Sequence, residues 1–73
     1  MNLKWRDDTE ISQLFYVNTA IFIVGQFMPT DSYWYVGLNS PLKFLLDVNK
    51  KFKTRESCKN YCNKALEKFK KGI

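Results

Sequence analysis

The last third of the chain has the pattern of one long amphipathic helix, and this feature constrains the fold most strongly. Apolar side chains recur there at intervals of three, four and seven residues, at Cys58, Tyr61, Cys62, Ala65, Leu66 and Phe69. This spacing places them on one stripe of a helix. Thr54 is a suitable N-cap, Glu56 suits the positive end of the helix dipole, and Gly72 is placed as a C-terminal cap. The pattern therefore predicts a helix over about 55–71, with its stripe buried against another layer.

The residues before this helix are typical of antiparallel strands. Leu3 and Trp5 alternate with polar residues, and β-branched and aromatic residues fill 14–27. Asn18-Thr19 is expected to kink that run or to divide it into two strands, and its length, greater than that of a usual strand, favours the division. The turn-forming residues 29–32 predict a hairpin onto a strand over Tyr33–Leu38. Residues 42–48 are expected to form a third major strand or an irregular edge, with a short helix as the minor alternative.

Strands followed by one terminal helix predict an α+β domain. A chain of 73 residues allows a single domain, 1–73, with a thin core. We expect an antiparallel sheet of three to five strands over about 3–48, packed on the helix. Strand alternation assigns Phe15, Val17, Ile21, Ile23 and Phe27 to one face. The expected buried residues are Trp5, Phe15, Ile21, Ile23, Trp34, Phe52, Cys62, Leu66 and Phe69.

The sequence lacks the residue groups of the common enzymes. It contains no His, so the usual general base near neutral pH and the commonest metal ligand are missing. Its serines therefore have no His to activate them, and its three glycines form no phosphate-binding loop. The acidic residues Asp7, Asp8 and Glu10 lack the spacing of a calcium loop. We expect no enzymatic activity, no cofactor and no bound metal.

The cysteines and the most apolar segment bear on the compartment. Cys58 and Cys62 are four residues apart in the expected helix, where Cβ atoms lie about 5–6 Å from each other. A disulfide needs about 3.5–4.5 Å, so two free thiols are predicted, as is usual in a reducing cytoplasm. The apolar stretch 14–28 is shorter than the about 20 residues of a membrane-spanning helix, and acidic residues precede it, unlike a signal peptide. We expect no membrane anchor.

Charge is distributed unevenly along the chain. Residues 1–49 hold three Lys or Arg and five Asp or Glu, whereas residues 50–73 hold nine and two, giving net charges of −2 and +7. The candidates for binding phosphate or nucleic acid surround the expected helix N-terminus, where backbone amides favour anions: Lys50, Lys51, Lys53, Arg55 and Lys59. No known nucleic-acid-binding motif accompanies them. A solvated lysine-rich surface is the plainer interpretation.

Tyr33-Trp34-Tyr35 is the most distinctive local motif. Alternation along a strand places Tyr33 and Tyr35 on one face and Trp34 on the other. One side would enter the core, and the other would present rings that suit base stacking or an anchor for a protein partner. The alternative is that all three fill the core of a small domain.

The layout of the chain is similar to that of a known group of proteins. LKW near the start, an aromatic hairpin around YWYV, and FKT opening a terminal helix resemble many small orphan proteins encoded by phages and prophages. The resemblance implies a host-takeover or anti-defence factor, anti-CRISPR proteins among them, that acts by stoichiometric binding in the host cytoplasm.

The leading hypothesis is therefore a non-enzymatic protein that binds a host protein or a nucleoprotein complex. The alternative is a nucleic-acid-binding module that uses the basic helix and the loop before it. A second copy of the chain, in a homodimer, is a further candidate partner.

Overall fold

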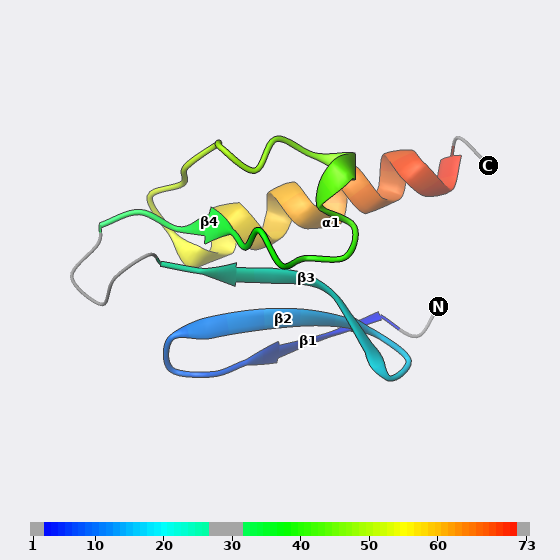
Figure 1. Ribbon diagram of the computed structural model, residues 1–73, viewed down its shortest axis with the longest axis horizontal. Coiled ribbons are helices and arrows are strands. Elements are labelled where there is room, and N and C mark those ends of the chain that lie inside the picture. Colours follow the sequence, from blue (N-terminus) through cyan, green and yellow to red (C-terminus); the bar gives the residue numbers. More distant parts are fainter. Residues whose placement is uncertain (1–2, 27–31, 72–73) are drawn as a thin grey trace.

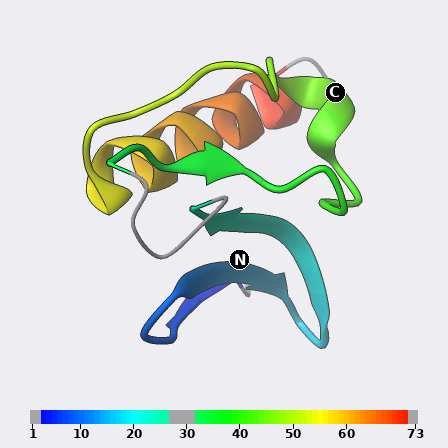
Figure 2. The same cartoon turned by 60° about the vertical axis from the view of Figure 1, so that its left-hand side comes forward.

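A computed structural model describes residues 3–26 and 32–71. Its elements are β1 (Leu3–Asp7), β2 (Ile11–Tyr16), β3 (Thr19–Gly25), β4 (Tyr35–Val36), the 3₁₀ helix η1 (Lys43–Leu45) and the helix α1 (Arg55–Lys71). The strands form one antiparallel sheet in chain order. Helix α1 and the connection 37–54 lie at the β3–β4 end of the sheet (Figure 1), and a view turned by 60° shows the same arrangement (Figure 2). The predicted α+β fold is confirmed.

Helix α1 begins as its sequence predicts. The Ser57 N–H donates to Thr54 Oγ1 at 3.1 Å, so Thr54 caps one of the backbone donors that a helix N-terminus leaves free. Cys62 and Leu66 of the stripe are buried. Phe69, also predicted to be buried, is 41% exposed because the last turns of α1 extend past η1 (Figure 1). The expected Gly72 cap lies outside the described residues.

The core lies between α1 and one face of the sheet. Its buried apolar residues are Leu14, Ile21, Phe22, Val24, Val36, Cys58, Cys62 and Leu66. Trp5, Trp34 and Phe52, which the sequence predicts in the core, are half-buried and pack against this cluster.

A β-bulge decides which side of the sheet each residue of β2 and β3 occupies. Leu14 pairs with Phe22, but Phe15 pairs with Ala20, which leaves Ile21 as an extra residue in β3. Ile21 and Phe22 are therefore both buried, and the alternation is interrupted. The prediction that Phe15 is buried is wrong, because β2 turns Leu14 inward and leaves Phe15 half-buried on the opposite face.

Because of the same bulge, the prediction that Ile23 is buried is also wrong. Strict alternation predicts Ile21 and Ile23 on one buried face, but the extra residue reverses the parity between them. Ile23 pairs with Gln13 on the face away from the core and is half-buried. Phe27, assigned to the same face by alternation, lies outside the described residues.

The predicted third strand over 42–48 is wrong, and the minor alternative, a short helix, is correct. Lys43–Leu45 is a 3₁₀ helix, and the segment before it forms hydrogen bonds with the backbone at the edge of β3 without becoming a strand. The Ser40 hydroxyl accepts a hydrogen bond from the Ile23 N–H at 2.9 Å, and the Leu42 N–H donates to the Ile21 carbonyl at 3.2 Å. The backbone of β3 thus finds partners that alternation alone does not indicate.

The strand predicted over Tyr33–Leu38 is shorter than expected. Only Tyr35–Val36 forms β4, and Trp34 makes a single antiparallel bridge to Phe52 beyond it. The turn expected at 29–32 lies outside the described residues except for Ser32.

The run 14–27 divides into two strands as predicted, but one residue earlier than expected: Val17 and Asn18 form the turn, and Thr19 already begins β3. Val17 has a φ of 58°, a left-handed conformation that a β-branched residue rarely adopts. Its side chain is 57% exposed. A strained residue therefore stands at the tip of this hairpin.

Val17→Gly is expected to stabilise the fold. Relief of about 1–2 kcal/mol of strain exceeds the about 0.5–1 kcal/mol that glycine costs through chain flexibility. Thermal unfolding should therefore show a midpoint raised by a few degrees. Asn18→Gly is the matched control, since Asn18 lacks a positive φ and its replacement should slightly lower the midpoint. A lower midpoint for Val17→Gly would contradict the strain.

Candidate binding surfaces

The face of the sheet turned away from α1 is the first candidate surface, and no described element covers it. The register places Lys4 opposite Phe15, Arg6 opposite Gln13, and Tyr35 opposite Gly25. The side chains that define this open sheet face are Lys4, Arg6, Ile11, Gln13, Phe15, Ala20, Ile23 and Tyr35. All of them are exposed or half-buried. The open sheet face therefore presents apolar and aromatic groups beside two cations.

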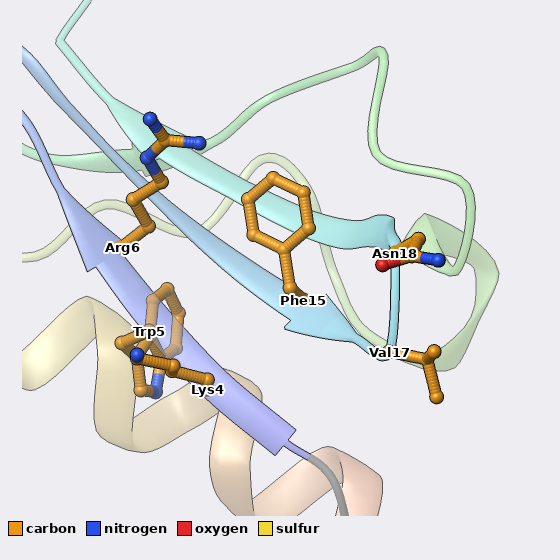
Figure 3. A pocket seen from close by; sticks show the side chains of 6 residues that line it. All are labelled: Lys4, Trp5, Arg6, Phe15, Val17 and Asn18. Atoms are coloured by element: carbon orange, nitrogen blue, oxygen red, sulfur yellow. The ribbon is translucent and has the colours of Figure 1, made fainter.

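The open sheet face is hollowed at both ends. A hollow of about 430 Å³ at the β1–β2 end is lined by Lys4, Trp5, Arg6, Phe15, Val17 and Asn18. Phe15 rises from β2 with Arg6 on one side and the Val17–Asn18 turn on the other (Figure 3). The side chains of Lys4 and Arg6 make no ion pair or hydrogen bond with any described residue. A second hollow of about 270 Å³ includes Ile11, Ile23 and Tyr35 in its lining.

The two candidate tyrosines have different surroundings. Tyr35 lies in β4 on the open sheet face and lines the second hollow. Tyr33 precedes the strand, and the Lys51 Nζ lies 4.4 Å from the centre of its ring. Trp34 packs toward the core, as alternation predicts. The structure thus brings Tyr35, rather than Tyr33, together with Ile23 at this surface.

Arg55, a candidate for anion binding, contacts the protein itself. Its Nη1 donates to the Asp8 carbonyl at 2.9 Å and its Nη2 to the Thr9 carbonyl at 2.7 Å. The guanidinium also stacks over the Trp34 ring at 4.5 Å. A planar group with several fixed donors suits both contacts, so Arg55 ties the β1–β2 turn to the start of α1.

Lys59 is also engaged within the fold. It is only 8% exposed, although its place in the sequence pattern predicts the polar side of α1. Its ammonium lies 3.0 Å from Asp7 Oδ1 and 5.0 Å from the centre of the Trp5 ring. The long stem can be buried because Asp7 pairs with its charge.

The contact with Lys59 also changes the pKa of Asp7. The neighbouring Ser12 hydroxyl and the Lys59 ammonium hold the pKa of Asp7 below its usual value. Ser12 Oγ has no hydrogen-bond partner among the described residues, so it acts on the carboxylate as a nearby dipole. Because the pKa of Asp7 is lower in the folded chain than in the unfolded chain, the contacts of its carboxylate stabilise the fold at neutral pH. This stabilisation is lost as the pH falls through the folded pKa of Asp7.

Lys50, Lys51 and Lys53 remain at the surface. Lys50 Nζ lies 4.9 Å from the centre of the Tyr61 ring, at the rim of a hollow of about 400 Å³. This hollow is also lined by Phe52, Ser57, Asn60, Tyr61 and Lys64. We call Lys50, Lys51, Lys53 and Lys64 the basic corner. Lys64 is not among the anion-binding candidates predicted from the sequence, although its helical spacing from Ser57 and Asn60 places the three residues on one face of α1.

Strand alternation places Phe15 in the core, and no sequence motif assigns a binding role to Lys4 and Arg6. Their alternation with Leu3 and Trp5 was the available signal, since it puts both cations on the side of β1 opposite the apolar residues. The partner strand was the missing part. Without the register of β2, nothing indicates that Phe15 joins them.

Arg55→Lys is expected to lower the free energy of unfolding by about 1–2 kcal/mol. Lysine keeps the charge, but it loses the two-pronged contact with the Asp8 and Thr9 carbonyls and the stacking on Trp34. Denaturation by urea would measure the change. Lys53→Ala, at an exposed neighbouring position, is the control and should change stability by less than about 0.5 kcal/mol. If Arg55→Lys is as stable as the unmodified chain, the Arg55 contacts do not hold the fold together, and Arg55 is again a candidate for anion binding.

Comparison of the chain with protein-family models, with curated proteins and with solved structures finds no match. Within residues 3–26 and 32–71, no three His, Cys, Asp or Glu side chains are grouped as metal ligands would be. In that same part of the chain, no helix is both long enough and apolar enough to cross a membrane. The open sheet face and the basic corner are therefore the two candidate binding surfaces of the described residues.

Proposed function

We propose that this chain is a non-enzymatic binding protein that holds a partner protein, alone or within a nucleoprotein complex, against its open sheet face. The observation that carries the proposal is the combination on that face of Phe15, Ile23 and Tyr35 with Lys4 and Arg6, two cations whose side chains pair with no described residue. Aromatic and arginine side chains are the usual anchors of protein interfaces, and exposed apolar patches mark interaction sites.

The resemblance of the sequence layout to small phage proteins supports a host protein as the partner and a host-takeover or anti-defence role, such as that of an anti-CRISPR protein. Such a role would be exerted in the host cytoplasm. Both cysteines are free thiols, which fits a reducing compartment.

The strained conformation of Val17 is independent support for partner binding at this surface. Its left-handed conformation costs about 1–2 kcal/mol, and glycine or asparagine would avoid that cost in a two-residue hairpin. The exposed side chain lines the same hollow as Phe15. A strained apolar residue at this position is typical of one that contacts a partner. Val17→Gly should therefore weaken binding while it raises stability.

Phe15→Ala and Tyr35→Ala are each expected to weaken partner binding by about 1 kcal/mol or more, because aromatic anchors carry most of the energy of a protein interface. The partner would be captured from nuclease-treated host lysate, purified and titrated by calorimetry. Phe44→Ala is the matched control, since Phe44 is 71% exposed on η1, outside the open sheet face. Equal affinities for Phe15→Ala, Tyr35→Ala and Phe44→Ala would refute the proposal.

The alternative, a nucleic-acid-binding module, is supported by the hollow beside Lys50, where Ser57 and Asn60 offer hydrogen bonds between two lysines. Binding of duplex DNA there would weaken with salt, with a log–log slope of about −0.9 per neutralised phosphate. Lys50→Glu combined with Lys64→Glu would abolish it, and Phe15→Ala would leave it unchanged. Those results, with capture lost on nuclease treatment, would replace the proposed function by this one.

A further inference from the structure

The outer edge of β1 carries backbone groups that have no partner within residues 3–26 and 32–71. The Asp8 N–H donates to the Ile11 carbonyl at 2.7 Å, directly after the paired residues Asp7 and Ser12. Hydrogen-bonded and non-hydrogen-bonded pairs alternate along an antiparallel ladder. Arg6 and Lys4 therefore direct their backbone groups toward β2, whereas Leu3, Trp5 and Asp7 direct theirs outward. No described residue bonds to these outward groups.

The side chains along this edge define what could pair with it. Lys4 and Arg6 are exposed on the open sheet face. Leu3 and Trp5 are half-buried on the opposite face, where they pack against the core. Residues of an added strand lie beside the β1 residues that they oppose, with successive side chains on opposite faces. The strand that best matches this edge therefore has acidic residues opposite Lys4 and Arg6 and apolar residues opposite Leu3 and Trp5.

We propose that β1 binds an extended segment of the partner protein in which acidic and apolar residues alternate, and that this segment becomes a fifth strand of the sheet. Main-chain hydrogen bonds to Leu3, Trp5 and Asp7 supply affinity, while Lys4 and Arg6 select the acidic residues. This inference rests on the proposed function and names the chemistry of its partner.

A second copy of the chain fits this edge poorly. Antiparallel pairing of two β1 strands through their outward groups can overlap at three or more residues in three registers. In each of these registers, Lys4 or Arg6 lies directly opposite Lys4 or Arg6 of the other copy. Like charges placed directly opposite each other destabilise a strand pair. The same two cations that disfavour self-pairing favour an acidic strand.

A charge exchange tests the inference with synthetic peptides. A peptide that alternates valine and glutamate is expected to bind the unmodified chain, and one that alternates valine and lysine is not. In the variant with Lys4→Glu and Arg6→Glu the preference should reverse, with a change in Kd of about tenfold or more for each peptide. Lys43→Glu with Lys68→Glu changes the net charge equally at exposed positions outside the open sheet face and the basic corner, and should leave both affinities unchanged. Unchanged preference in the Lys4/Arg6 variant would overturn the inference.

Backbone pairing is tested separately from charge. If the peptide runs antiparallel to β1, as every other strand pair of this sheet does, its valine amides face β1 and its glutamate amides face solvent. Methylation of the valine nitrogens should abolish binding, and methylation of the glutamate nitrogens should preserve it. Hydrogen exchange by NMR should slow at the amides of Leu3, Trp5 and Asp7 when the unmodified peptide is added. Tight binding of the valine-methylated peptide, or a stable homodimer through β1, would contradict the inference.

The two proposals fail in different ways. If purified partner binds with a dependence on Phe15 and Tyr35 but not on Lys4 and Arg6, the edge-strand inference is wrong and the proposed function stands. If the peptide binds at β1 but no partner depends on Phe15 or Tyr35, the proposed function is wrong and the edge of β1 is still a peptide-binding site.

Discussion

Phe22→Ala is expected to lower the free energy of unfolding by about 3–5 kcal/mol, the range for removing a buried aromatic side chain. Phe22 is fully buried at the centre of the sheet, opposite Leu14 and in the cluster that packs under α1. A chain of this size has a total stability near the low end of about 5–15 kcal/mol. Urea denaturation followed by circular dichroism should therefore find this variant largely unfolded without denaturant.

Phe15→Ala is the matched comparison, because the same chemical change is made on the opposite face. Phe15 is half-buried and pairs with Ala20 beyond the bulge, so its loss should cost less than about 1.5 kcal/mol. The order of the two variants tests the register. Strand alternation read from the sequence places Phe15 in the core, and a larger loss for Phe15→Ala than for Phe22→Ala would restore that assignment.

The helix could be predicted from the sequence, whereas the faces of the strands could not, and the difference has a physical cause. In 55–71 the apolar residues form a single stripe among charged ones, so only one orientation of α1 buries them. In β2 and β3 apolar residues occupy both parities, because Leu14 and Phe15 are adjacent, as are Phe22 and Ile23. Alternation then gives no unique face, and the bulge at Ile21 has no sequence signal of its own.

Which candidate residues are free to bind a partner could not be predicted from the sequence, because it depends on contacts between distant segments. The charge pattern identified Arg55 and Lys59 as cations near the N-terminus of α1, and both lie there. It could not indicate that Arg55 meets the Asp8 and Thr9 carbonyls, or that Lys59 meets Asp7, because these partners are 46 or more positions away. Local patterns predict which residues carry charge, while the register of β1 decides which charges are already paired.

Thiol labelling is expected to show the second large effect. Cys58 and Cys62 are fully buried one helical turn apart, and both are free. The hydrogen bond with Cys58 and burial raise the pKa of the Cys62 thiol, so little of its reactive thiolate forms near neutral pH. Labelling of the native chain should be about 10³-fold slower than labelling of the unfolded chain, because it requires opening of the core. Two thiols should titrate after denaturation without reductant.

The same measurement separates the core from the open sheet face. Leu66 lies one turn beyond Cys62 and is buried, so Leu66→Ala should cost about 2–5 kcal/mol and accelerate labelling of both cysteines about 30-fold or more. Phe15→Ala should change the rates far less. If core opening is a single cooperative event, Cys58 and Cys62 respond to Leu66→Ala by the same factor. Rapid labelling of either cysteine in the unmodified chain would show that α1 exposes part of its stripe, and Leu66 would then not report on the same core as Phe22.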